Sequence, residues 1–275
     1  MTVVDQEPTL IKVSVGPRNA YIDERGLRKY VWKGLEYPSV TTIRRMAGMP
    51  FPLHEWAIKE VCLRAIERYR DLGQILEPGT ADAALAARKW LRAASVEKRD
   101  AAARLGTAVH DAASEGRALT EVSADVAPFL RHYQDWLAVS GAEIIATEKQ
   151  VFNLTVGFAG TFDSMVRFRN QQRWIVDLKT GKGIYPEHAL QCLAYAMGEF
   201  IGEDDVVDEQ LTSFLKDITG IAILHLRDDG WEWDEVVVTP ELWKAFQSLL
   251  GFAVWADDNQ NMDKLTRGRR TGAAA

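Results

Sequence analysis

The chain has 275 residues, 47% of them hydrophobic, and a formal net charge of −6. This composition predicts a soluble globular protein with a substantial core and excludes a uniformly basic protein that simply coats nucleic acid. No apolar run is long enough to span a bilayer, and residues 1–10 lack a signal-peptide pattern. The two cysteines, Cys62 and Cys192, form no paired-ligand motif, so we expect a protein of the reducing cytoplasm without membrane contact.

Charge is distributed unevenly along the chain. Residues 199–263 contain 16 acidic and 3 basic residues, so the rest of the chain carries a net charge of +7. A face that binds DNA is therefore expected within residues 1–198. An acidic surface that is merely well solvated explains the same distribution.

The N-terminal part predicts short strands followed by a short helix. Alternating apolar and polar residues over 10–37, with turn signals at 16–17, 26 and 33–34, are typical of short antiparallel strands. Ser39 or Thr41 is positioned to cap a short helix that ends near Met46.

Helices are then expected in succession. Apolar spacing predicts a helix from Leu53 to Leu72 that Gly73 ends, and an alanine-rich helix over residues 80–94. Ser95 is a good N-cap for a helix to about Glu115, and another helix is predicted over 123–139.

One histidine in the helix that begins at Ser95 is a candidate ligand. Gly106 and His110 are four residues apart and share a helical face, where glycine lets another backbone approach the imidazole. A structural or solvent-facing histidine is the alternative interpretation.

Three consecutive antiparallel strands are predicted over residues 144–152, 158–168 and 174–179, and each carries an acid: Glu148, Asp163 and Asp177. Two like charges about 4 Å apart repel by roughly 4 kcal/mol at an effective dielectric constant of 20. If the acids converge, a cation is the natural explanation. Glu148 equally fits an exposed polar patch.

The third strand ends in charge. The apolar residues 174–176 lead into Asp177, Leu178 and Lys179, and a threonine and a glycine then break the strand. Asp177 and Lys179 point to the same face, where a carboxylate can hold a hard cation and an ammonium can offset phosphate charge. An ordinary ion pair at a strand end is the alternative.

The next helix begins after Pro186 and places Gln191 and Tyr195 on one face, either at the site or at a polar surface edge. The remaining expected elements are a helix over 205–218, strands over 221–226 and 231–238, and a helix from Pro240 to about Trp255.

In this order and spacing, Gly-x-x-x-His, Gly-x-x-Asp, Asp-x-Lys and Gln-x-x-x-Tyr resemble the PD-(D/E)XK nuclease superfamily, and more narrowly its RecB-type branch, which includes phage-encoded exonucleases. The resemblance covers about residues 106–195, and the segment 38–42 with the later Trp56 is similar to the opening of the phage-encoded members. It implies a restriction-endonuclease-like α/β core, a mixed central sheet flanked by helices, with an N-terminal helical portion.

The resemblance also implies roles for individual residues. Mg²⁺ or Mn²⁺ would be ligated by His110, Asp163, Asp177 and the backbone carbonyl of Leu178, with Glu148 as a further candidate. Lys179 would orient the attacking water and stabilise charge on the phosphate, as a catalytic residue alongside Asp163 and Asp177. Gln191 and Tyr195 would brace Lys179 or touch the substrate backbone.

Two departures from the family pattern are visible. Many relatives hold an iron–sulfur cluster with four cysteines, which two cysteines in one chain cannot supply. Phe162 stands where proline often precedes the aspartate. No Walker-type phosphate loop occurs, which disfavours a different phosphoryl-transfer enzyme.

The sequence therefore predicts a metal-dependent DNase that hydrolyses phosphodiester bonds, an exonuclease serving recombination, repair or replication. Its expected partners are a DNA duplex end or single strand and a recombination or replication protein, in the bacterial host cytoplasm if the chain is phage-encoded. The expected division is an N-terminal region 1–94, a nuclease core 95–263 and a disordered basic tail 264–275. The alternative is a non-catalytic nucleic-acid-binding or assembly module on the same fold.

Overall fold

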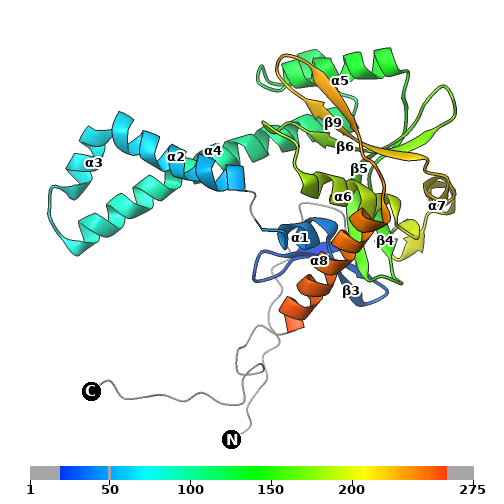
Figure 1. Ribbon diagram of the computed structural model, residues 1–275. Helices are drawn as coiled ribbons and strands as arrows, with labels where there is room; N and C mark the ends of the chain where they lie inside the picture. The colour runs from blue at the N-terminus through cyan, green and yellow to red at the C-terminus, as the bar shows by residue number, and fades with distance from the viewer. Residues whose placement is uncertain (1–18, 49–50, 259–275) are drawn as a thin grey trace, which may run out of the picture.

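The computed structural model describes residues 19–48 and 51–258, so the predicted turn at 16–17 and the tail 264–275 lie outside the described residues. A seven-stranded mixed sheet occupies the centre of the core, in the order β10-β9-β6-β5-β4-β7-β8 (Figure 1). Its strands are β4 (Glu143–Asn153), β5 (Phe158–Arg167), β6 (Arg173–Lys179), β7 (Phe200–Glu203), β8 (Val206–Val207), β9 (Gly220–Leu226) and β10 (Trp231–Glu235). This is the mixed α/β class that the sequence predicts.

The strand pairing agrees with the prediction for the central hairpins. β4, β5 and β6 are consecutive and antiparallel, whereas β6 and β9 pair in parallel, with Asp177 beside Ile223. A parallel pair needs a long crossover, and the chain between these two strands supplies it with two helices. They are α6 (Pro186–Ala196) and α7 (Glu209–Lys216).

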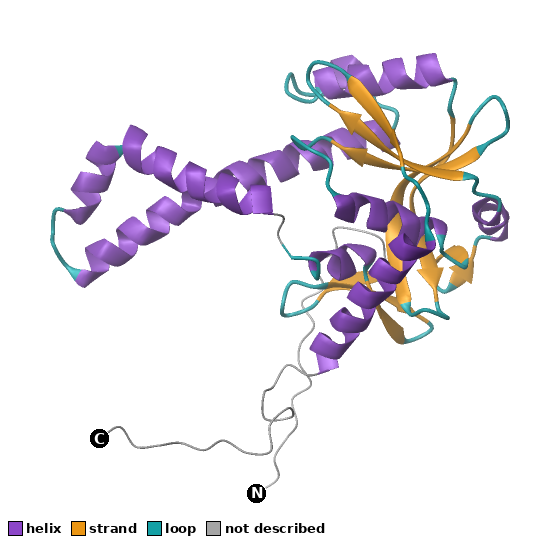
Figure 2. Cartoon of the chain, in the orientation of Figure 1, coloured by secondary structure: helices purple, strands orange, loops and turns teal. Residues whose placement is uncertain are grey.

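Helices cover both faces of the sheet (Figure 2). One face packs against α6, α1 (Val40–Arg45) and α8 (Pro240–Asp258), in a core that includes Phe162 and Phe246. The other face packs against α5 (Ala127–Ser140) and the C-terminal part of α4 (Ala81–Ser114), in a core that includes Val109 and Trp136. A one-turn 3₁₀ helix, Leu119–Glu121, joins α4 to α5.

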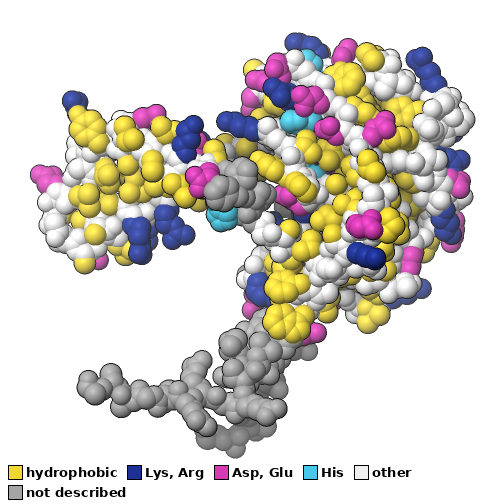
Figure 3. Space-filling view, viewed as in Figure 1, with side chains coloured by type: hydrophobic (Ala, Val, Ile, Leu, Met, Phe, Trp, Pro, Cys, Tyr) yellow, Lys and Arg dark blue, Asp and Glu magenta, His cyan; other side chains and the backbone are white. Residues whose placement is uncertain are grey.

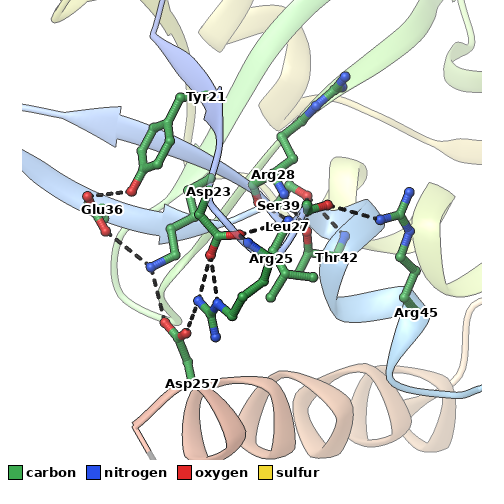
Figure 4. Close-up of polar contacts among 12 residues, drawn as sticks. Tyr21, Asp23, Arg25, Leu27, Arg28, Glu36, Ser39, Thr42, Arg45 and Asp257 are labelled. Carbon is green, nitrogen blue, oxygen red and sulfur yellow. Dashed lines mark hydrogen bonds and ion pairs between the residues drawn. The ribbon is translucent and has the colours of Figure 1, made fainter. Parts of the chain in front are cut away.

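A small antiparallel sheet of β1 (Ala20–Ile22), β2 (Arg28–Trp32) and β3 (Leu35–Pro38) packs on the core through Tyr30 and Trp32. Ion pairs attach it to the last helix, because Asp257 of α8 contacts both Arg25 and Lys29 (Figure 4). Ser39, at the end of this sheet, caps α1 by accepting a hydrogen bond from the Thr42 amide at 2.9 Å.

Helices α2 (Phe51–Glu67), α3 (Tyr69–Leu76) and the N-terminal part of α4 form an arm that projects from the core (Figures 1 and 2). Its visible face carries many hydrophobic side chains, with lysine and arginine side chains along the margins (Figure 3). The guanidinium carbons of Arg64 in α2 and of Arg68, just after α2, lie 5.5 and 5.4 Å from the centroid of the Trp90 ring. These cation–π contacts hold α2 against α4.

The helix predicted to begin at Ser95 does not begin there. Thr80 caps α4 by accepting from the Ala83 amide at 3.1 Å, and the helix then continues through Ser95 to Ser114. Alanine-rich sequence on both sides of Ser95 propagates a helix more cheaply than a new helix is nucleated. The predicted domain boundary between residues 94 and 95 falls inside this helix, and the domain division stays a prediction.

Two other predicted helices differ. The helix expected from Leu53 to Leu72 ends at Glu67, and α3 continues through Gly73, because one glycine costs a helix only about 1 kcal/mol. The helix expected from Asp205 is shorter: Asp204 and Asp205 have positive φ and form a two-residue hairpin turn between β7 and β8. Asp208 then caps α7.

The ends of two further elements were predicted differently. The helix expected over 123–139 begins at Ala127 and ends at Ser140, followed by the C-cap Gly141, whose φ is +64°. Strand β10 ends at Glu235 rather than residue 238. Among the described residues, no helix combines the length and the apolar character that a membrane span requires.

Candidate active site

Three elements bring an imidazole and two carboxylate side chains together beside the middle of strands β4 and β5. His110 comes from the last turns of α4, Glu148 from β4 and Asp163 from β5. One ligand atom from each side chain lies within 4.8 Å of the others. His110 Nδ1 is 3.6 Å from Asp163 Oδ1 and 3.9 Å from Glu148 Oε1. We call these three residues the carboxylate cluster.

The backbone around the carboxylate cluster explains how it forms. Glu148 faces Asp163 across the β4–β5 ladder but has a φ of +51°, and the ladder skips that pair. A non-glycine residue in this region is uncommon and is held by its surroundings. Asp163 also reaches the next strand, where its Oδ2 accepts a hydrogen bond from the Leu178 amide at 2.7 Å.

A backbone carbonyl completes the group of oxygen and nitrogen atoms. His110 Nε2 lies 3.0 Å from the carbonyl oxygen of Leu178, so the two ring nitrogens face a carbonyl and two carboxylates. Burial would lower the pKa of His110, but Asp163 and Glu148 raise it to about 9. The imidazolium form therefore offsets one of the two carboxylate charges at neutral pH when no other cation is bound.

A second group shares the Leu178 carbonyl with the first and is buried except for its lysine. The Asp177 side chain is 0% exposed and forms an ion pair with Lys179, whose side chain is 19% exposed. Gln191 Nε2 donates to Asp177 Oδ1 at 3.0 Å and to the Tyr195 hydroxyl at 3.0 Å. We call these four residues the lysine centre.

Burial and charge pairing both shift the pKa values of the lysine centre. Burial raises the pKa of Asp177, and the Lys179 ammonium opposes that effect. Burial would lower the pKa of Lys179, but Asp177 and then Asp163 raise it. The Lys179 ammonium also donates to the Leu178 carbonyl at 3.2 Å, so this carbonyl oxygen joins both groups.

Two glycines singled out by their spacing make room for side chains of the site. A Cβ at Gly160 would lie 2.6 Å from Tyr195 Cε1, and a Cβ at Gly106 would lie 3.1 Å from Thr180 Oγ1. Glycine at 160 therefore admits the Tyr195 ring, and glycine at 106 admits the residue that follows Lys179.

Two histidines hold the loop between β6 and α6. His225 Nε2 lies 2.6 Å from the Gly181 carbonyl oxygen, and the Tyr185 amide donates to His188 Nδ1 at 3.2 Å. Burial, followed by Lys179 and Arg44, lowers the pKa of His188 to about 4, so its ring stays a neutral acceptor. Neither histidine had been singled out, because single imidazoles without a spacing pattern carry no signal.

The structure groups the predicted site residues differently from the expected ligand set. His110, Asp163 and the Leu178 carbonyl come together as expected, and Glu148, the further candidate, lies with them. The Asp177 carboxylate instead faces Lys179 and Gln191, so it is not part of the carboxylate cluster. Gln191 and Tyr195 are buried in the lysine centre and do not form a polar surface edge.

A cleft of about 680 Å³ lies beside Lys179, between the arm and the loop after β6. Trp56, Lys98 and Arg99 line it from the arm, and Lys182 and Tyr185 line it from the loop. Sequence reasoning noted Trp56 only for its resemblance to a family motif. The other lining residues could not be found from the sequence, because the angle at which the arm leaves the core has no local signal.

No family model matches the chain, and no curated protein matches its sequence. Solved structures that match include one described as "Crystal structure of SSO0001", with 14% sequence identity and a TM-score of 0.28. That match covers 52% of this chain and 68% of the other. A likeness at this level carries no argument about function, so the candidate site is judged on its own geometry.

Proposed function

We propose that this protein is a metal-dependent DNase of the PD-(D/E)XK superfamily, RecB-type branch, and that it acts as an exonuclease in recombination, repair or replication. One observation carries the proposal: the cluster of His110, Glu148 and Asp163 lies next to the half-buried ammonium of Lys179. Carboxylates, a carbonyl and an imidazole around one point are the donors that Mg²⁺ and especially Mn²⁺ accept.

The residues present fit such a cation. His110, Glu148, Asp163 and the Leu178 carbonyl would hold it, and two carboxylates would balance its charge. A divalent cation supplies Lewis-acid stabilisation of charge on a phosphate and favours deprotonation of water. Enzymes lower reaction barriers by about 8–23 kcal/mol, and slow phosphodiester hydrolysis needs the upper part of that range.

The chain's own residues would perform the remaining work. Lys179 is fixed by Asp177 and lines the cleft, so its ammonium can bind a phosphate oxygen and orient a water molecule. Gln191 and Tyr195 position Asp177, and through it Lys179, from behind. We therefore assign Lys179 and Asp163 direct contact with the reacting groups and cation, and Asp177, Gln191 and Tyr195 a positioning role.

The orientation of Asp177 favours a second candidate, a non-catalytic nucleic-acid-binding or assembly module. Its carboxylate is enclosed by Lys179 and Gln191 and is not directed at the carboxylate cluster. A module of this kind would bind DNA without cleaving it.

Cleavage of defined DNA separates the two candidates. The purified protein is incubated with end-labelled linear DNA and with closed circular DNA, in Mg²⁺, in Mn²⁺ and in EDTA. The exonuclease proposal expects metal-dependent loss of linear DNA only, abolished by Lys179→Ala. Lys216→Ala changes an exposed lysine of α7 that does not line the cleft, so it is the matched control and should retain cleavage. Binding without cleavage in either metal would favour the second candidate, and cleavage of circular DNA would identify an endonuclease.

A further inference from the structure

The cleft beside Lys179 has the dimensions of a small-ligand site and not of a duplex channel. Its volume of about 680 Å³ lies within the roughly 300–1,000 Å³ that is typical of pockets for single small molecules. One or two nucleotides have this size. Two base pairs of duplex contain four nucleotides and exceed it.

Charge in the cleft suits a polyanion. Its lining includes one acid and four cations, which come from α4 and from the segment around the end of β6: Lys98, Arg99, Lys179 and Lys182. A groove lined by cations can follow a phosphate backbone. The lone acid, Glu60, is 8% exposed and forms an ion pair with Lys98, so these two charges cancel. Arg99 and Lys179 pair with Asp100 and Asp177, which do not line the cleft, so the lining itself, with four cations and one acid, carries a net charge of +3.

Two aromatic side chains line the cleft from different elements. Trp56 comes from α2, and Tyr185 comes from the loop before α6. Both are partly exposed, and the apolar remainder of the lining surrounds them. Aromatic rings among cations are the pattern of sites that bind single strands, because every base offers a face for stacking.

The helix that carries Trp56 is fixed to α4 by a buried carboxylate. Glu60, four residues later on α2, lies one helical turn from Trp56 and forms an ion pair with Lys98 of α4. This contact joins α2 to α4 beside the cleft, so the backbone that carries the indole is in place before a base stacks on the ring.

We propose that this cleft binds the unpaired end of a DNA strand, with a base stacked on Trp56 and the adjacent phosphates held by Arg99 and Lys182. The proposal rests on the proposed nuclease function for the role of Lys179, which would receive the next phosphate along the same strand. It assigns the substrate of the site as a single-stranded end, so a duplex must lose base pairs at its terminus before it is cleaved.

The test measures binding of the full chain in EDTA, where cleavage is prevented. The probes are a single-stranded oligonucleotide with 2-aminopurine near its end, the same strand with abasic sites at those positions, and the same strand in a blunt duplex. Stacking is expected to quench the 2-aminopurine emission. Trp56→Ala should weaken binding of the normal strand by roughly 5- to 100-fold, the range that corresponds to loss of one stacked base.

Two comparisons make the result specific. Trp56→Ala should leave the affinity for the abasic strand unchanged, and Trp56→Phe should recover most of the quenching. Tyr69→Ala removes an exposed aromatic ring of the same arm that lies outside the cleft, and it should change the affinity for neither the normal nor the abasic strand. Equal losses for normal and abasic strands, or tighter binding of the blunt duplex without quenching, would overturn the proposal.

Cleavage assays run in parallel with Mn²⁺ keep the two proposals separate. Metal-dependent cleavage without a stacking signal defeats the cleft assignment alone. A stacking signal that depends on Trp56 but comes with no cleavage supports the cleft and defeats the nuclease function.

Discussion

The two halves of the candidate site share the Leu178 carbonyl, yet they differ in almost every physical respect. The carboxylate cluster is partly open: the side chains of Glu148, His110 and Asp163 are 46%, 24% and 15% exposed. In the lysine centre only Lys179 reaches the surface, with 19% of its side chain exposed, and Asp177 and Tyr195 are buried in the core. The carboxylate cluster can exchange the proton on His110 for a metal cation. In the lysine centre, burial and hydrogen bonds hold the side chains in one arrangement.

The difference indicates which half tolerates change. In the carboxylate cluster, water can replace a lost partner, so substitutions there should alter ligand affinity more than stability. In the lysine centre, a lost partner leaves a buried charge unpaired, so substitutions should alter stability and activity together. Each of the following predictions tests one side of this contrast.

The largest effect is expected in the lysine centre. Lys179→Met keeps much of the side-chain volume but leaves Asp177 buried without its cation, which costs about 3–5 kcal/mol. Urea unfolding should show this loss with an unchanged slope, and cleavage should be abolished. Asp177→Asn combined with Lys179→Met removes both charges and should recover part of the stability but no activity. If Lys179→Met proves as stable as Lys182→Met, the ion pair contributes nothing.

This expectation corrects a simpler one that the sequence supports. A strand end next to a threonine and a glycine indicates that Asp177 and Lys179 are accessible and that either can be replaced by alanine without harm to the fold. In the structure α6 covers the end of β6, and Asp177 is 0% exposed. Burial by a distant element has no local signature in the strand.

The second prediction uses the proton on His110. In the metal-free protein its pKa is raised from 6.5 to about 9, so its stabilising contribution is complete below pH 6.5 and is lost as the pH rises through about 9. A bound cation must displace that proton, so calorimetric Mn²⁺ affinity should rise about tenfold per pH unit between pH 7 and 9.

His110→Ala should bind Mn²⁺ more weakly and should lose this pH dependence. His132→Ala, on the exposed surface of α5, is the matched control and should keep it. A variant at position 110 that retains its Mn²⁺ affinity and melts much earlier would identify His110 as a packing residue. Activity should also be higher in Mn²⁺ than in Mg²⁺, because nitrogen ligands suit Mn²⁺ better.

The third prediction concerns the wall of the lysine centre. Gly160→Ala places a methyl group 2.6 Å from Tyr195 Cε1 and 3.0 Å from Val40 Cγ2, and overpacking of this kind costs about 1–3 kcal/mol. The Tyr195 ring must move away from Gln191, so cleavage should fall together with the melting temperature. Tyr195→Phe keeps the ring and removes only the hydroxyl, so it should retain more stability. Equal stability of Gly160→Ala and the wild type would show that the wall is flexible.

Much of the core was predictable because its signals are local. The antiparallel order of β4, β5 and β6 follows from alternation and turns, and four spaced motifs place His110, Asp163 and Lys179 near one another. The sequence could not show that Glu148 and Asp163 lie in the carboxylate cluster while Asp177 lies in the lysine centre. That division depends on the positive φ of Glu148 and on where α6 packs, and both are set by tertiary contacts.

The arm shows the same limit on a larger scale. Serine at position 95 is a good helix start in isolation, but it lies in the middle of a 34-residue helix. Lys98 and Arg99, in the middle of this helix, line the cleft, and His110, near its C-terminal end, lies in the carboxylate cluster. A prediction that divides the helix at Ser95 keeps these three residues together but separates them from Trp90, through which the same helix packs against Arg64 and Arg68.

The smallest effect separates helix propensity from the site at a single glycine. Alanine is favoured over glycine in a helix by about 1 kcal/mol, so Gly106→Ala should stabilise α4 if nothing else changed. Its new methyl group would lie 3.1 Å from Thr180 Oγ1, a tight contact that requires the threonine to shift by a few tenths of an ångström. We expect these effects to cancel in the free energy of unfolding, while displacement of the residue after Lys179 lowers cleavage severalfold.

Gly73→Ala is the matched control, because it lies in α3 with no atom within 4 Å of the added group, and it should gain the full helix propensity with unchanged cleavage. If Gly106→Ala is stabilised as much as Gly73→Ala and cleaves normally, the close approach of Thr180 to α4 has no role in positioning Lys179.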